Sequence, residues 1–201
     1  NIPEDETLLC VLLGSRKNEV KIHAPVITDA MRRLHKNYPS LSIVAPTVST
    51  VSAAVRTLVT PWPAPVVVVD NDRDKYDAMA ASNAALAVSG TVTLELALSS
   101  VPTVVTYRIH RVSAIIVRFL MVLKFANLVN WLLDREAIPE FIQADCRGDF
   151  LADAVSHLLG NPEAVKQQQA DSAAAMSMLS PKNGTPSDAA ATVVLGMCED
   201  N

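Results

Sequence analysis

Aromatic side chains are scarce in this 201-residue sequence, at 4% of residues, although half of all residues are hydrophobic. The apolar content is mostly Ala, Val and Leu, which is typical of buried parallel strands with helices packed over them. This length and this content of hydrophobic residues suffice for one sizeable domain or two small ones. The composition therefore excludes a disordered chain.

Cysteine and histidine are also sparse, and their spacing excludes the common disulfide and zinc patterns. The three cysteines, Cys10, Cys146 and Cys198, are odd in number and contain no C-x-x-C pair. The four histidines form no pair at the spacing of metal ligands. We therefore expect reduced thiols in a cytoplasmic protein, with no metal and no other cofactor.

An excess of positive charge is absent too, because the formal net charge is −4 at pH 7. This balance argues against a general nucleic-acid binder, although it leaves room for a local basic patch. The sequence shows no signal peptide at its start. It begins at Asn1 without a methionine, so we expect an upstream part.

Apolar runs and helical periodicity alternate along the first half of the chain. The expected strands are residues 7–13, 41–45, 66–69, 84–88 and 103–107, and the expected helices between them are residues 19–36, 49–58 and 74–81. The order predicts a Rossmann-like, doubly wound parallel sheet with helices on both faces. Later helices are expected at residues 151–159, 162–179 and 187–197. We accordingly predict a domain at residues 1–160 and a helical tail at 161–201, which serves in packing or dimer contact.

The segment from Ser89 to Glu95 is the most informative one, because it joins a predicted strand to a predicted helix through a glycine turn. At a helix start, backbone N–H groups lack intrahelical partners, so Ser89, Gly90 and Thr91 could hold a phosphate. Glu95, one turn later, could accept hydrogen bonds from vicinal hydroxyls, as in a ribose. The alternative is purely structural, since small residues followed by an acid also resemble a helix cap.

A second turn, Gly14-Ser15-Arg16, follows the first predicted strand. In a doubly wound sheet this turn and the Ser89 turn project from the same edge, where ligands bind. Arg16 can offer a fork of donors to phosphate oxygens. Its structural alternative is a solvated arginine at a helix start, a position where a cation is disfavoured without an anionic partner.

The stretch from residue 110 to 133 is strongly apolar but interrupted by charges, so we reject a membrane-spanning segment. Together its basic residues would suit contact with an anionic membrane face. A helix buried against the sheet, with its basic side chains extending to solvent, explains the pattern equally well. The basic residues concerned are Arg108, His110, Arg111, Arg118 and Lys124.

Several motifs, in order and spread from about Leu8 to Leu159, resemble the C-terminal half of lipid-A-disaccharide synthases. They are Leu12 to Arg16 with Glu19, Tyr38-Pro39, Pro46, Ser89 to Glu95 continuing to Pro102, Val104-Val105, Tyr107-Arg108, Asn130 with Arg135-Glu136, and Pro139 to Gln143. The resemblance implies a GT-B glycosyltransferase fold, in which the C-terminal of two Rossmann-like domains holds the UDP-sugar donor. It implies transfer of 2,3-diacylglucosamine from its UDP derivative to lipid X, on the inner face of the inner membrane of a Gram-negative bacterium, with no metal.

The resemblance also assigns roles to particular residues. Gly14, Ser15 and Arg16 match the family's glycine-serine-arginine turn, with Arg16 expected at the diphosphate. Ser89, Gly90 and Thr91 are expected to cradle phosphate, and Glu95 to hold the ribose. The loop 70–73 lies where the uracil pocket is expected, and Asn130 and Gln143 are expected sugar contacts.

Two departures from the family qualify these expectations. Asp134 replaces a glycine before Arg135, and a carboxylate near a diphosphate would repel it unless it points away. The acceptor-binding N-terminal half, with the acidic residue expected to deprotonate the acceptor hydroxyl, is missing from this chain. We therefore expect the chain to bind UDP or a UDP-sugar without turnover.

The sequence also allows two other interpretations of the function. A chain without its acceptor half could serve as a non-catalytic module that binds lipid surfaces or dimerises through residues 110–133. Another GT-B enzyme of UDP-sugars, such as a UDP-N-acetylglucosamine epimerase, would share the phosphate turn and the ribose acid. Asn130 and the Pro139 to Gln143 segment argue against that second alternative.

Overall fold

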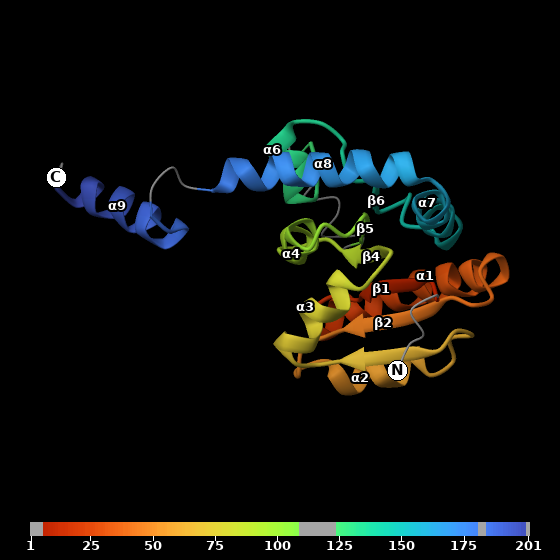
Figure 1. Ribbon diagram of the computed structural model, residues 1–201. Coiled ribbons are helices and arrows are strands. Elements are labelled where there is room, and N and C mark those ends of the chain that lie inside the picture. The colour runs from red at the N-terminus through yellow and green to blue at the C-terminus, as the bar shows by residue number, and fades with distance from the viewer. Residues whose placement is uncertain (1–5, 109–123, 181–183, 200–201) are drawn as a thin grey trace.

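A six-stranded parallel sheet in the order β3-β2-β1-β4-β5-β6 forms the centre of the computed structural model, which describes residues 6–108, 124–180 and 184–199 (Figure 1). This order is that of the Rossmann fold, and it confirms the fold class predicted from the sequence. The strands are β1 (Leu8–Leu12), β2 (Ser42–Pro46), β3 (Val66–Val69), β4 (Ala84–Val88), β5 (Thr103–Tyr107) and β6 (Glu140–Ile142).

Helices cover both faces of the sheet. They are α1 (Lys17–Asn37), α2 (Ser52–Val59), α3 (Asp72–Ala80), α4 (Val92–Leu98), α6 (Leu128–Leu133), α7 (Gly148–Gly160), α8 (Pro162–Leu179) and α9 (Pro186–Glu199). Alternate residues of β1 separate the two layers: Leu9 and Val11 pack with α1, α2 and α7, while Leu8, Cys10 and Leu12 pack with α3 and α4. Because both faces are covered, β1 is buried along its whole length.

Two short elements, β6 and α6, are absent from the sequence prediction. Strand β6 has three half-buried residues and pairs with β5, and α6 has six residues. Neither is long enough to show a clear hydrophobic period. Among the described residues, no helix combines the length and the apolar character needed to cross a membrane.

Helix α8 begins at the predicted start of the tail but packs on the domain. It contacts α4, α6 and α7, and Ala175 is fully buried in that interface. The amide of Gln168 bonds both backbone groups of Thr103 at the start of β5, with Nε2 donating to the carbonyl at 3.1 Å. The first helix of the tail is thus continuous with the core of the sheet.

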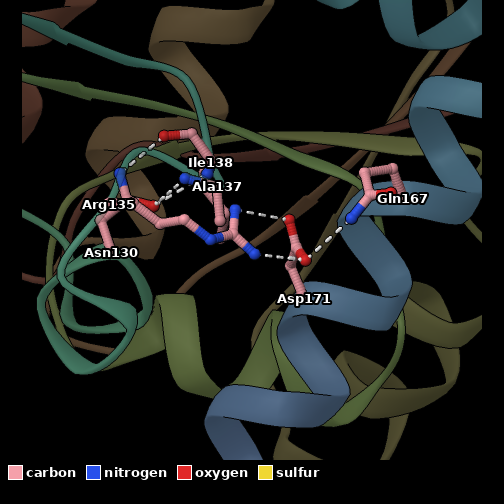
Figure 2. A network of polar contacts seen from close by, with 6 residues as sticks. All are labelled: Asn130, Arg135, Ala137, Ile138, Gln167 and Asp171. Carbon is pink, nitrogen blue, oxygen red and sulfur yellow. Dashed lines mark hydrogen bonds and ion pairs between the residues drawn. The ribbon is translucent and has the colours of Figure 1, made fainter.

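A bidentate ion pair joins α8 to the loop after α6 (Figure 2). The guanidinium of Arg135 donates from Nη1 and Nη2 to the two carboxylate oxygens of Asp171, at 3.0 and 2.6 Å. Gln167 donates to the same carboxylate at 3.0 Å, and the Asp171 side chain is only 9% exposed. The hydrogen bond from Arg135, assisted by Gln167, holds the pKa of Asp171 below its ordinary value.

Replacing this carboxylate should destabilise the chain in a pH-dependent way. We expect Asp171→Asn to lower the free energy of unfolding by about 1–2 kcal/mol near pH 7, the low end for charged hydrogen bonds because solvent screens the half-exposed Arg135. A depressed pKa stabilises above the unfolded pKa, so the difference should shrink below about pH 4. Urea unfolding between pH 3 and 7 measures it. The exposed Asp153→Asn on α7 is the control, and a difference that persists undiminished at pH 3 would contradict the ion pair.

Candidate functional site

A cleft of about 440 Å³ opens beyond the carboxyl ends of β1, β2 and β4. There β1 lies between β2 and β4, so the strand order reverses at this point, which is where doubly wound sheets bind ligands. Residues from both predicted turns line this one cleft. They are Gly14, Ser15, Arg16, Ser89, Gly90, Thr91 and Glu95.

The first turn is held by a carboxylate of the helix that it opens. Gly14 has a φ of +100°, and a Cβ there would lie 2.9 Å from two atoms of Glu19. Glu19 Oε2 accepts from the backbone N–H groups of Ser15 and Arg16, at 3.0 and 3.3 Å, and Oε1 lies 2.5 Å from Arg16 Nη1. Glu19 therefore occupies the anion position at the start of α1 and neutralises Arg16, whose side chain is 79% exposed on the cleft.

The second turn leaves its helix start open to the cleft. Thr91 makes no side-chain cap to α4, and the Thr93 hydroxyl donates instead to the carbonyl of Gly90 at 2.8 Å. Ser89 Oγ donates to the carbonyl of Ala126 at 2.7 Å, which ties the turn to the loop before α6. A Cβ at Gly90 would meet nothing within 4 Å. The capping alternative is therefore not the arrangement found at Thr91.

Lys75, a cleft residue that the sequence reasoning missed, pairs with Glu95. Its Nζ lies 2.7 Å from Glu95 Oε2, and the two side chains are 18% and 29% exposed. Burial alone would lower the pKa of Lys75, but the hydrogen bond and charge of Glu95 outweigh it and raise that pKa. The segment around Lys75 is rich in charge, so the helix predicted at residues 74–81 resembles a solvated one. Its place after β3, at the same sheet edge, was the signal that could have identified it.

The sequence matches a known protein family over most of its length. The profile of one family, described as Lipid-A-disaccharide synthetase, matches residues 1–193. The chain belongs to this family. The lipid-A-disaccharide synthase of Rhodospirillum centenum is 48% identical over 170 residues, covering 85% of this chain and 42% of the relative. The lipid-A-disaccharide synthase of Gluconobacter oxydans is 38% identical over 200 residues, which cover 100% of this chain and 48% of the relative. The chain thus spans about half the length of these curated lipid-A-disaccharide synthases.

Solved structures show the same fold at low sequence identity. WaaG, a glycosyltransferase involved in lipopolysaccharide biosynthesis, superposes with a TM-score of 0.61 at 15% identity, over 94% of this chain and 47% of that one. The UDP-GlcNAc 2-epimerase from Neisseria meningitidis, bound to UDP-GlcNAc, superposes with a TM-score of 0.57 at 14% identity. The superposition covers 89% of this chain and 46% of the epimerase chain. This member of the lipid-A-disaccharide synthase family therefore shares the GT-B fold with these structural neighbours.

Asn130, for which the family resemblance implied a sugar contact, lies away from the cleft. It is fully buried, and its Oδ1 accepts from the backbone N–H groups of Ala137 and Ile138, both at 2.8 Å. Its Nδ2 donates to the carbonyl of Ile138 and to Glu140 Oε1, both at 2.7 Å. These bonds engage the whole amide, so in this structure Asn130 organises the loop between α6 and β6.

Other residues expected at the site also lie apart from it. Gln143 follows β6 with a φ of 52°, half-buried at the same sheet edge but outside the cleft lining. The loop 70–73 lies outside the lining as well, and the Asp70 carboxylate accepts from Ser52 and Arg56 at 2.7 and 3.1 Å. Asn71 caps α3 through the N–H of Asp74.

Asp134 points away from the cleft, so its carboxylate would not repel a diphosphate bound there. It ends α6 in the left-handed region, with a φ of 51°, a conformation that glycine adopts without strain. Its carboxylate pairs with Lys124 Nζ at 2.7 Å and is 82% exposed. The family's glycine at this position is thus explained by backbone conformation.

Arg108 and His23 join the first turn of α1 to the end of β5. His23 is fully buried, with Nδ1 2.8 Å from the carbonyl of Glu19 and Nε2 accepting from the N–H of Arg108 at 2.8 Å. Burial lowers the pKa of His23. The Arg108 guanidinium donates to the carbonyl of Cys146, so Arg108 serves a structural contact. The expected basic surface at His110, Arg111 and Arg118 lies outside the described residues.

Proposed function

We propose that this chain forms the donor site of a lipid-A-disaccharide synthase, with UDP-2,3-diacylglucosamine as the donor and lipid X as the acceptor. The product would be the β(1→6)-linked disaccharide of lipid A, with UDP as the leaving group. One observation carries the proposal: the Arg16 turn and Glu95, far apart in sequence, line one cleft at the switch point of the sheet. Membership of the family supplies the reaction.

In this proposal each wall of the cleft has its own role. Negative charge grows on the diphosphate as the glycosidic bond breaks, and the Arg16 guanidinium stabilises it. The turn before α4, Ser89 to Thr91, faces the phosphates with the backbone N–H groups of Gly90 and Thr91, since the N–H of Ser89 is bonded to Thr106 in β5. Glu95 accepts hydrogen bonds from the ribose hydroxyls. Gln143 is proposed to contact the sugar from the neighbouring strand end.

The proposal covers the donor half of the reaction only. The acceptor site and the base that deprotonates the acceptor hydroxyl are assigned to residues beyond these 201, so this chain alone is proposed to bind donor without turnover. We place the protein on the inner face of the inner membrane, where both lipid substrates are. Homodimer contact is assigned to α9, where Val193, Val194 and Leu195 are exposed.

The ribose role of Glu95 can be tested by comparing two ligands. We expect Glu95→Ala to weaken binding of UDP by about 1.5–3 kcal/mol, because a charge-assisted hydrogen bond is lost, and to change binding of pyrophosphate little. Titration calorimetry measures both affinities. Glu163→Ala, an exposed carboxylate on α8, is the control. Equal losses for the two ligands would remove Glu95 from the ribose site.

A further inference from the structure

We propose that Lys75 is a positioning residue that holds the Glu95 carboxylate toward the ribose hydroxyls of the donor, and so sets the preference for a ribonucleotide. This inference rests on the proposed UDP-sugar site. It assigns a role to a side chain that touches the ligand only through Glu95.

The position of Lys75 in its helix is unfavourable without a partner. The N–H of Lys75 bonds the carbonyl of Asn71, the N-cap of α3, so Lys75 lies in the first turn, where the helix dipole opposes a cation. Its side chain is nevertheless about four-fifths buried, with Nζ 4.5 Å from the centre of the Tyr76 ring. Such a placement needs a compensating anion.

Glu95 supplies that anion from a different helix. The Lys75–Glu95 pair, at 2.7 Å, bridges α3 and α4 beside the cleft, whereas Asp72 on the same helix lies 4.0 Å from Nζ and is 97% exposed. Lys75 engages Oε2 of Glu95, which leaves Oε1 to accept from a hydroxyl. The lysine thereby fixes one oxygen and orients the other.

The Lys75–Glu95 pair also neutralises the charge of the carboxylate in the cleft. A bare carboxylate beside a diphosphate would repel it, and the ammonium of Lys75 cancels that repulsion at short range. The opposite wall carries the same combination, with Arg16 on Glu19. Both walls therefore bring a carboxylate into an anion site while keeping the wall near neutral.

The inference is tested with UDP, 2′-deoxy-UDP and pyrophosphate, titrated into the chain by calorimetry. The wild-type chain should prefer UDP over 2′-deoxy-UDP by about tenfold, the size of one hydrogen bond to a charged group. Lys75→Met should reduce this preference to less than about threefold. Because it also leaves the Glu95 carboxylate unpaired beside the phosphates, binding of pyrophosphate should weaken as well. Lys75→Arg should restore the preference.

Two controls separate positioning from other effects. Lys166→Met removes an exposed cation on α8, away from the cleft, and should change none of the three affinities. In a Glu95→Gln background, Lys75→Met should alter the preference no further, since both changes act through one carboxylate. Thermal unfolding of each variant confirms that it is folded.

The opposing outcomes are distinct. If Lys75→Met weakens all three ligands by the same factor, Lys75 acts only through its charge near the phosphates and the positioning role is wrong. An unchanged preference for UDP would remove Lys75 from ribose recognition altogether. A wild-type chain that binds none of the ligands overturns the proposed donor site itself, whereas a wild-type chain that shows the preference, with Lys75→Met unaffected, overturns this inference alone.

Discussion

The Arg16→Ala variant should bind UDP more weakly than the wild-type chain by about 1.5–3 kcal/mol, which is roughly 10- to 150-fold in Kd. The guanidinium is exposed on the cleft and already within reach of one anion, the Glu19 carboxylate at 2.5 Å. A diphosphate carries more charge than a carboxylate and would draw the arginine toward it. Titration calorimetry with UDP measures the loss.

Arg33→Ala is a matched control for this experiment. Arg33 lies near the other end of the same helix and is also paired with a carboxylate, Asp29, at 2.9 Å. It is about half-exposed and lies far along α1 from the cleft. An Arg16→Ala variant that binds UDP as tightly as Arg33→Ala does would exclude Arg16 from the diphosphate site.

Part of the expected loss comes from Glu19, which Arg16→Ala leaves without its partner. The freed carboxylate stays on the N–H groups of Ser15 and Arg16, and so competes with phosphate for the start of α1. Adding Glu19→Gln to Arg16→Ala should therefore recover some affinity. The recovered fraction measures repulsion by Glu19, and the remainder is the direct contact of the guanidinium with the diphosphate.

The fold and the position of the cleft were predictable because they follow from local patterns. Strands buried on both faces are continuous apolar runs, and in a parallel sheet every turn after a strand reaches the same edge. Gly14 to Arg16 and Ser89 to Glu95 come directly after β1 and β4, so their meeting required only the strand order. The sequence could not reveal how each side chain is partnered there.

Lys75 and Asp134 illustrate that limit in opposite ways. Lys75 lies in a charged segment that resembles a solvated surface, and only the packing of α3 beside α4 brings it to Glu95. The sequence suggested that the Asp134 carboxylate would repel the diphosphate. In the structure Asp134 has a left-handed backbone conformation and its carboxylate pairs with Lys124. Both outcomes depend on contacts between segments, which residue spacing does not encode.

Replacing Asn130 should have the largest effect on stability of the substitutions considered. The sequence alone does not distinguish a structural role of this residue from a binding role. We expect Asn130→Ala to lower the free energy of unfolding by about 3 kcal/mol, because a buried N–H group, a partly buried one and a buried carbonyl lose their partners. Urea unfolding at neutral pH measures the change. Asn161→Ala, which removes a single cap to the N–H of Ala164, should cost only about 1 kcal/mol.

The affinity of the folded Asn130→Ala chain decides between the two roles. Asn130 reaches the cleft only indirectly: it donates to Glu140, which also accepts from the N–H of Ala126, and the Ala126 carbonyl accepts from Ser89. A loss transmitted along these bonds should be small for UDP, within about threefold, since the backbone of the turn at Ser89 keeps its own bond to β5. If Asn130→Ala instead leaves stability unchanged and abolishes binding of a UDP-sugar while sparing UDP, Asn130 is a sugar contact, and the loop must rearrange when the donor binds.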